Sequence, residues 1–462
     1  MGRQTTRLQV SGYRFTMRRL AHALVRADVR MIDDPLRAQS VSLTAGCVIA
    51  AVALGACGVM AVLRPQGVPG DAPIVRDRVS GALHVRIGET LHPVPNLASA
   101  RLITGSPAEP KTVGPSALAG LPRGPMVGIP GAPAAVGAPI SAGESTWTVC
   151  DTAMATTVLV GPRPAESEPD AALLVVARSE GPAMTYLLYG GRRAAVDLRD
   201  PAVVRALRVE GVVPRPVSRV LLDAVPESPP ITAPRIADAG APGVLPGRPV
   251  GTVVRVARGG GSEFFVVLAD GLQRIGEVTA DLIRFTVRQP HGEVPDVAPD
   301  VLADAGIVDP LPVATFPARI AIADPVVPCV HWTAGQGRSA AVLGDGRELL
   351  AAPGTVELAQ ADGAAPNIDA VRVPAGRSAY LRPVSATGAG GSAEPRLLLT
   401  DSGVLFGVPD DDTAGSLGIA EAPLPAPWPV LARLPRGPEL SRESASVVRD
   451  AVPGVPTAPA AP

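Results

Sequence analysis

The feature that most constrains this chain is a run of 23 residues, from Val41 to Leu63, that contains no charged side chain. A helix of that length rises about 34 Å, more than the roughly 30 Å thickness of a bilayer hydrocarbon core. Just before it, Asp34 suits the N-cap of a helix and Pro35 suits the first helical position. The run therefore predicts one transmembrane helix over residues 41–63.

Three other interpretations of this run stay open at the level of the residues. A buried core helix is one, although a long uncharged run at one end of a chain is unusual for it. A cleaved signal peptide is another, but its basic region would be about 40 residues long instead of the usual few. Leu54-Gly55-Ala56-Cys57 also matches a lipoprotein cleavage box with Cys57 lipidated; cleavage there would discard everything before it.

The charge on either side of the run predicts its orientation. Residues 1–63 contain eight arginines and three acidic residues, a net charge of +5, whereas the whole chain has a net charge of −1. The remaining chain therefore carries −6. Because basic residues near a membrane helix are retained in the cytoplasm, we expect a cytoplasmic amino terminus and a large domain outside the cytoplasm.

Residues 1–40 are predicted to form a cytoplasmic amphipathic arm. Apolar side chains recur at helical spacing, and basic side chains follow another face at Arg14, Arg18, Arg19, Arg26 and Arg30. Such an arm lies on anionic lipid, docks on a cytoplasmic partner, or is simply solvated. No aromatic interleaving or binding motif points to nucleic acid.

The rest of the chain is predicted to be rich in β-strands and turns. The whole chain is 46% hydrophobic, so most of it should fold, yet its 49 glycines and 52 prolines disfavour long helices. Four stretches share a plan of strand, glycine turn, strand and helix, at 82–103, 186–209, 264–285 and 396–419. Gly190-Gly191 and Asp270-Gly271 suit hairpin turns with positive φ. Uneven spacing excludes a regular solenoid; chance similarity is the alternative.

Two cysteines lie outside the predicted helix, each near a tryptophan: Cys150 near Trp147, and Cys329 near Trp332. In an extracytoplasmic domain this pair is typical of one disulfide, which would contribute about 5 kcal/mol in the entropic treatment. Two buried thiols are the alternative. His331 is close to Cys329, but the further ligands of a metal site are missing.

A phosphate-loop candidate surrounds the only lysine of the chain. Gly105, Lys111 and Thr112 have the right spacing, but Pro110 replaces the second glycine and has no N–H to offer a phosphate. No hydrolase motif is present either. The residues therefore predict no catalytic site, no metal and no cofactor, with ATP the only alternative. Residues 450–462 predict a flexible Pro/Ala-rich tail.

Long motifs give the chain a resemblance to a known family. They include TRLQVSGYRF (6–15), HALVRADVRMIDDPLRAQ (22–39), LHPVPNLASARLI (91–103), PRGPMVGIPGAP (122–133), WTVCD (147–151) and APWPVLARLPRGPELSR (426–442). Over essentially its whole length the sequence resembles EccB, a membrane component of the type VII (ESX) secretion system of actinobacteria. Its short length resembles the compact ESX-4-like members.

The resemblance implies an α+β, β-rich periplasmic domain in which four small repeat units surround a central β-barrel-like domain, tied by a disulfide between Cys150 and Cys329. The expected bounds are 64–135, 172–228, 245–289 and 396–440 for the repeats, 136–171 and 290–395 for the central domain, and 441–462 for a C-terminal extension.

The same resemblance implies a place in the inner membrane as a single-pass structural subunit that links a cytoplasmic motor to the periplasm. It implies homo-oligomers assembled with EccC, EccD and EccE. Some members of the family are labelled ATPases, and their repeats look like cell-wall-binding modules. ATP hydrolysis and peptidoglycan binding are therefore the two alternative functions.

Overall fold

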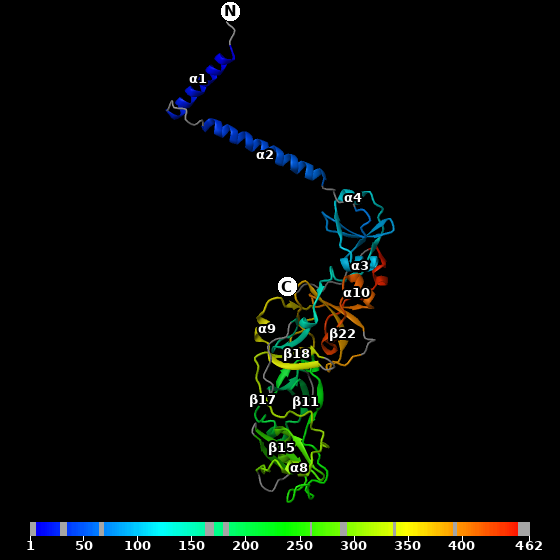
Figure 1. Cartoon of the computed structure of the whole chain (residues 1–462). Coiled ribbons are helices and arrows are strands. Elements are labelled where there is room, and N and C mark those ends of the chain that lie inside the picture. The colour runs from blue at the N-terminus through cyan, green and yellow to red at the C-terminus, as the bar shows by residue number, and fades with distance from the viewer. Residues whose placement is uncertain are drawn as a thin grey trace, which may run out of the picture. The chain divides into compact units, whose positions relative to one another are not determined.

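The computed structural model describes residues 6–27, 35–63, 69–161, 171–178, 184–258, 261–286, 293–335, 339–390 and 395–450 (Figure 1). The chain divides into two compact units, residues 1–68 and residues 69–462. We describe each unit by itself.

The first unit contains two helices, α1 (Arg7–Arg26) and α2 (Pro35–Leu63). A capping box between Thr6 and Gln9 begins α1, and Ala27 ends it in the left-handed region at φ 56°. As predicted, Pro35 is the first residue of α2. Asp34 and Arg30 lie outside the described residues.

The second unit is built largely from sheets. Four of them follow one order along the chain: three antiparallel strands, a helix, a strand or bridge parallel to the first, a short helix, and a strand or bridge parallel to the third. We call them module 1 (69–125), module 2 (171–229), module 3 (251–309) and module 4 (377–438).

Their elements are as follows. Module 1 contains β1 (Ile74–Asp77), β2 (Leu83–Ile87), β3 (Thr90–Val94), α3 (Leu97–Thr104), β4 (Lys111–Val113) and α4 (Pro115–Ala119). Module 2 contains β9 (Ala171–Ala177), β10 (Thr185–Tyr189), β11 (Arg192–Val196), α5 (Pro201–Ala206), β12 (Arg215–Val217), α6 (Arg219–Asp223) and β13 (Glu227–Ile231).

Module 3 contains β14 (Val253–Arg258), β15 (Gly261–Val267), β16 (Leu272–Ile275), α7 (Glu277–Thr286) and α8 (Val301–Ala305). Module 4 contains β22 (Arg377–Val384), β23 (Arg396–Thr400), β24 (Leu405–Val408), α10 (Asp411–Leu417), β25 (Leu424–Pro427) and α11 (Trp428–Leu431). Parallel bridges to Arg123, Asp296, Ile307 and Arg436 complete modules 1, 3 and 4.

The first strand of each module precedes the hairpin that the sequence analysis singled out. In module 4 this strand is β22, which lies inside the segment 290–395 expected for the central domain. The sequence of β22 does not indicate that this strand belongs to module 4, because β22 and its partner strand β23 are separated by residues 385–395.

Glycines shape two of the hairpin turns differently. Gly190 and Gly191 have φ of 47° and 75°, which confirms the predicted positive-φ turn. Gly271 is not among the positive-φ glycines, so that part of the prediction was wrong. A Cβ on Gly271 would lie 2.8 Å from a methyl carbon of Val308, so this glycine permits the close approach of another chain segment.

A fifth sheet lies between the modules in sequence and has the order β19-β18-β7-β8-β21-β20. Its strands are β7 (Thr146–Asp151), β8 (Thr156–Gly161), β18 (Pro328–Ala334), β19 (Ser339–Asp345), β20 (Val356–Glu357) and β21 (Ala370–Arg372), with α9 (Arg347–Ala351) after β19. Over the described residues this sheet is open, ending at β19 on one side and at β20 on the other.

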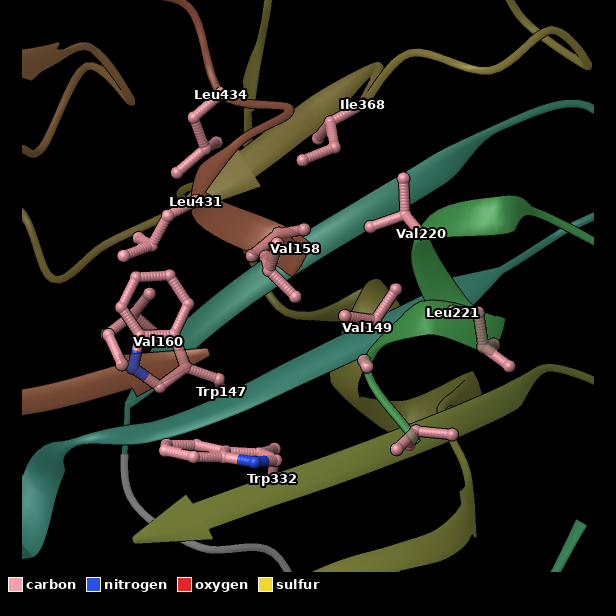
Figure 2. Packing of buried hydrophobic residues seen from close by; sticks show 14 of the residues in the cluster. Trp147, Val149, Val158, Val160, Val220, Leu221, Trp332, Ile368, Leu431 and Leu434 are labelled. Carbon is pink, nitrogen blue, oxygen red and sulfur yellow. The ribbon is translucent and has the colours of Figure 1, made fainter. Parts of the chain in front are cut away.

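The largest hydrophobic core joins this central sheet to modules 2 and 4 (Figure 2). Trp147 and Trp332 are directly opposite one another on β7 and β18, and both are almost fully buried. Val220 and Leu221 of α6 and Leu431 of α11 pack into the same core. The central sheet thus has apolar partners from two modules that are far apart in the sequence.

Helices join the modules in pairs. α3 of module 1 packs with α10 of module 4, and α5 of module 2 packs with α7 of module 3. We call these contacts the 1–4 seam and the 2–3 seam. Short elements add to them: α12 (Arg442–Ala445) packs on α3, β26 (Val448–Arg449) pairs with β5 (Met126–Val127), β6 (Ala138–Pro139) pairs with β22, and β17 (Ala321–Ile322) pairs with β9.

Candidate functional site

The membrane anchor is α2. Within it, Gln39–Val59 has a mean hydropathy of 2.0 and no part of it is buried by protein, so its apolar side chains need an apolar surrounding. Cys47 and Cys57 are exposed free cysteines on this helix. Among the described residues, one helix is therefore long and apolar enough to span a membrane, as predicted.

Helix α1 carries the predicted basic residues. Arg14, Arg18 and Arg19 are exposed along it, and Arg26 is its last residue. Its large apolar side chains are also exposed: Leu8 by 84%, Tyr13 by 64% and Leu24 by 83%. A helix with both kinds of side chain exposed suits a lipid surface or a protein groove.

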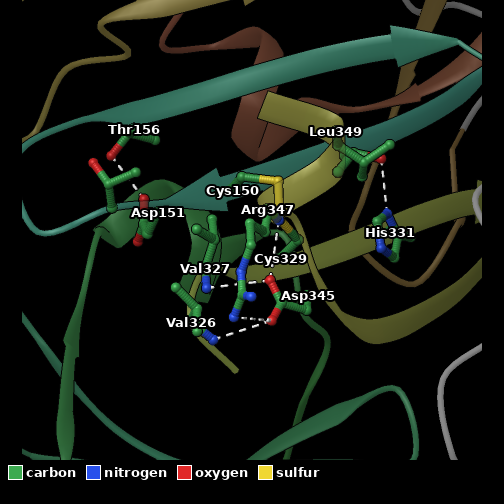
Figure 3. Close-up of a disulfide and its surroundings, with 12 residues drawn as sticks. Cys150, Asp151, Thr156, Val326, Val327, Cys329, His331, Asp345, Arg347 and Leu349 are labelled. Atoms are coloured by element: carbon green, nitrogen blue, oxygen red, sulfur yellow. Dashed lines mark hydrogen bonds and ion pairs between the residues drawn. A yellow bond between two sulfur atoms is a disulfide. The ribbon is translucent and has the colours of Figure 1, made fainter. Parts of the chain in front are cut away.

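The predicted disulfide between Cys150 and Cys329 is confirmed (Figure 3). The two residues are directly opposite one another on β7 and β18 and are fully buried. Gly346 covers them so closely that a Cβ there would lie 2.0 Å from the Cys329 sulfur. Asp345 fixes this turn by accepting hydrogen bonds from the backbone N–H groups of Val326 and Arg347. The bond therefore closes a loop of 179 residues inside a packed site.

Asp151, next to Cys150, is a buried junction that the sequence analysis missed. Its carboxylate is 1% exposed, pairs with Arg178 at 2.9 Å and accepts a hydrogen bond from the hydroxyl of Thr156. It also accepts one from the backbone N–H of Ser218, the N-cap of α6. A buried carboxylate requires such partners, so Asp151 links the central sheet to module 2. The WTVCD motif was its only sequence signal.

The phosphate-loop candidate has the reverse order of elements. In a phosphate loop a strand leads into the loop and a helix follows it. Here α3 ends at Gly105, and Lys111 and Thr112 begin the strand β4. The side chain of Lys111 is exposed. Lys111 is therefore not at a helix N-terminus: it pairs with β1, and the next helix, α4, begins only at Pro115.

Two arginines that the sequence analysis did not single out join modules 1 and 4. Arg101 of α3 is buried and donates a hydrogen bond of 2.9 Å to the carbonyl of Leu417, the last residue of α10. Arg442 donates one of 2.9 Å to the carbonyl of Ile103 near the end of α3. Arg101 thus reaches the last carbonyl of α10 in module 4, and Arg442 of α12, which follows module 4, reaches a carbonyl near the end of α3 in module 1.

His331, the histidine near Cys329, has a structural environment and not that of a metal ligand. The His331 ring shares a 2.8 Å hydrogen bond with the hydroxyl of Thr148, in the middle of the central sheet. Among the described residues no group of three or more histidine, cysteine, aspartate or glutamate side chains is placed to hold a metal ion.

These features define a class of protein: a membrane-anchored subunit with one apolar helix near its amino terminus and a large, disulfide-closed β-rich domain. The family model for the type VII secretion system ESX-1 transport TM domain B, EccB, matches residues 2–454. The chain belongs to the EccB family.

Individual relatives span nearly the same length. The chain is 39% identical to the ESX-3 secretion system ATPase EccB3 of Mycolicibacterium smegmatis, over 97% of this chain and 91% of that protein. It is 37% identical to the ESX-2 secretion system ATPase EccB2 of Mycobacterium tuberculosis, over 97% and 96%.

Solved structures agree. A chain of an intact ESX-5 inner membrane complex matches with a TM-score of 0.70 at 32% identity, covering 100% of this chain and 98% of that one. A chain of the EccB3 dimer from the ESX-3 core complex matches with a TM-score of 0.68 at 34% identity, covering 81% and 100%.

Proposed function

We propose that this protein is a structural subunit of a type VII secretion complex in the inner membrane, where copies of it form a homo-oligomer. The observation that carries the proposal is the match over its whole length to a chain of an ESX-5 inner membrane complex. The EccB3 dimer supports the self-association. We further propose EccC, EccD and EccE as its partners.

Native purification from membranes tests this assignment. The full chain, extracted in mild detergent, should co-purify with the other membrane components in a particle that contains several copies of it, as measured by mass spectrometry. Recovery of this chain by itself as a monomer would contradict the proposal.

We propose that the amino terminus is cytoplasmic and that residues 69–462 lie in the periplasm. The eight arginines before the end of α2 support this orientation, and the disulfide needs an oxidising compartment. In spheroplasts, an impermeant amine reagent should label Lys111, the only lysine. Labelling that requires lysed membranes would contradict this orientation.

We propose that α1 docks on a cytoplasmic component of the complex and thereby connects it to the periplasmic domain. Its exposed apolar and basic side chains support this role. Deletion of residues 1–34 should leave the chain in the membrane but separate it from its partners during purification. Unchanged co-purification would contradict the docking role.

We propose that modules 1 to 4 are copies of one repeat unit, because all four have the same order of strands and helices. A barrel-like closure of the central domain stays a prediction. Peptidoglycan binding by these modules stays a prediction as well. A pull-down with insoluble peptidoglycan that recovers none of the full chain would contradict it.

ATP hydrolysis is the second candidate function, because the relatives are named ATPases. We favour a structural role without a cofactor, since a helix leads into residues 105–112 and Lys111 begins a strand, which is the reverse of the order in a phosphate loop. If Lys111 served ATP hydrolysis, Lys111→Ala would abolish turnover by the purified chain. We expect no difference in turnover between Lys111→Ala and the parent chain.

A further inference from the structure

The two helices of each module pack on opposite faces of its sheet. Successive strand residues point to opposite faces, and in module 4 Leu398 packs with α10 whereas Leu397 and Leu399 pack with α11. In module 1 the corresponding clusters put α3 on one face and α4 on the other. We call the face that carries the second, shorter helix the short-helix face.

In modules 2 and 4 the short-helix face is buried in the central core. Leu188 of module 2 and Leu399 of module 4 occupy the same place in their sheets, and both are almost fully buried. Leu188 pairs with Arg193, and Leu399 pairs with Leu405. The backbone N–H groups of Arg193 and Leu405 donate to the carbonyls of Pro226 and Pro435, which shows that the two places are equivalent. This face is therefore an apolar contact surface where another part of the chain covers it.

At two of the equivalent places module 1 has a cation where module 4 has a leucine. The backbone N–H of Leu91 donates to the carbonyl of Pro122 in the same way, and Leu91 pairs with Arg86. Arg86 therefore stands where modules 2 and 4 have Leu188 and Leu399. Lys111 pairs with Val75 on β1; the same place holds the partly buried Leu424 in module 4 and Arg215 in module 2, where Arg215 has Asp324 and the carbonyl of Val326 as partners. An apolar partner would leave such cations desolvated. The face thus suits an anionic partner instead.

A third cation, Arg123, lies on the bridge that completes this sheet and is exposed. Beside it, burial and the charge of Arg123 lower the pKa of His84, so this imidazole adds no charge at neutral pH. Asp77 is the acidic group next to His84, and it accepts hydrogen bonds from the Val79 N–H and the Ser80 hydroxyl. The positive charge of the face comes from Arg86, Lys111 and Arg123.

The chain enters module 1 on this same face. Arg86 donates a hydrogen bond of 2.8 Å to the carbonyl of Gly70, and Lys111 is next to that glycine. Only five residues separate the last residue of α2, Leu63, from Pro69. Fully extended, that segment reaches about 20 Å. Arg86 and Lys111 are therefore tethered within a short reach of the end of α2.

We propose that the short-helix face of module 1 binds the phosphate groups of anionic phospholipids through Arg86, Lys111 and Arg123. Each basic side chain near an anionic leaflet favours the bound state by about fivefold. A lipid surface would cover the face that the rest of the chain covers in modules 2 and 4. The proposal rests on the membrane anchoring of the chain, but not on which side its termini lie.

Lys111, as the only lysine, makes the test specific. The full chain would be placed in nanodiscs of phosphatidylcholine, with or without phosphatidylglycerol, and acetylated with an uncharged N-hydroxysuccinimide ester. Peptide mass spectrometry would follow the rate at Lys111. We expect labelling to be slower by about fivefold or more in the anionic nanodiscs, and the difference to disappear in about 1 M salt, where screening acts within about 3 Å.

Variants with the same net charge distinguish binding by the short-helix face of module 1 from a general effect of protein charge. Arg86→Gln with Arg123→Gln should remove the protection of Lys111, whereas Arg199→Gln with Arg205→Gln, on exposed positions of module 2, should preserve it. In Lys111→Arg with Arg199→Lys, the relocated lysine should react equally in both lipids.

Three results would overturn the proposal. Equal labelling of Lys111 in the two lipids would exclude contact with anionic headgroups. Protection that persists in Arg86→Gln with Arg123→Gln would exclude these side chains as the cause. Protection in the complete secretion complex in neutral detergent, with none in anionic nanodiscs, would assign the face to a protein partner. Because nanodiscs expose both leaflets, none of these results depends on the proposed secretion function.

Discussion

The 1–4 seam and the 2–3 seam join modules of the same architecture, but they are closed in different ways. Modules 2 and 3 lie entirely between Cys150 and Cys329, so a covalent loop encloses them. Modules 1 and 4 lie outside that loop, and non-covalent contacts hold them together through Arg101 and Arg442. A covalent loop thus constrains modules 2 and 3, whereas arginine side chains that bind helix-end carbonyls join modules 1 and 4.

The two seams also differ in how far their polar contacts are buried. At the 1–4 seam, a buried arginine reaches the backbone at a helix end, and Arg442 does so across 339 residues of sequence. At the 2–3 seam, the exposed Arg208 of module 2 forms an ion pair with the partly exposed Glu277 of module 3. Buried charged hydrogen bonds contribute more than exposed ion pairs, so the 1–4 seam should depend more on single residues.

The largest effect should come from removing the disulfide. Cys150→Ser with Cys329→Ser should lower the free energy of unfolding by about 2–5 kcal/mol. Hydrogen exchange should rise more in modules 2 and 3 than in modules 1 and 4, since only the former are enclosed. Cys47→Ser with Cys57→Ser in α2 is the control, with no change expected. A uniform rise across all modules would contradict the distinction between the seams.

Truncation after Leu440 should have the next largest effect. It removes α12, the buried Ala445 and the bond from Arg442 to Ile103, a loss of about 3 kcal/mol. Chemical denaturation should show this loss, and hydrogen exchange should rise in module 1. The matched truncation after Asp450 removes only the Pro/Ala-rich end and should change neither readout. Equal stability of the two truncated chains would show that the contacts of α12 with α3 do not stabilise module 1.

Arg101 should contribute less by itself. Arg101→Met preserves much of the side-chain volume but loses the bond to Leu417, and should lower the free energy of unfolding by about 2 kcal/mol. Arg101→Lys retains the charge and should recover part of that loss. Thermal unfolding measures both. No difference between the methionine variant and the parent would show that the cap on α10 is dispensable.

The smallest effect is expected at the 2–3 seam. Arg208 is 63% exposed in its pair with Glu277, so Arg208→Ala should change the free energy of unfolding by less than about 1 kcal/mol. The same denaturation measurement applies. A loss as large as that of Arg101→Met would remove the contrast between the seams.

The sequence predicts some of these features well because their signals are local. The uncharged run of α2, the glycine pair at 190–191 and the cysteines required only composition and spacing. The sequence also carries a more specific signal for the disulfide: Trp147 precedes Cys150 by three residues and Trp332 follows Cys329 by three. That mirror spacing is what two antiparallel strands need to pair both residues at once.

Other features were hidden because their partners are distant. Nothing near Arg101 indicates that it will meet Leu417, 316 residues later. Nothing near Gly271 indicates that it will accommodate Val308 instead of adopting positive φ. The cationic replacement at Arg86 becomes visible only when the pairing registers of modules 1, 2 and 4 are compared.

The insertion of modules 2 and 3 between β8 and β18 also has a consequence for the timing of folding. If the chain crosses the membrane from its amino-terminal end, Cys150 emerges 179 residues before Cys329. During that interval the central sheet lacks β18, and Cys150 is a free thiol. Modules 2 and 3 emerge within that interval, and the last strands to emerge complete a domain that its first strands began.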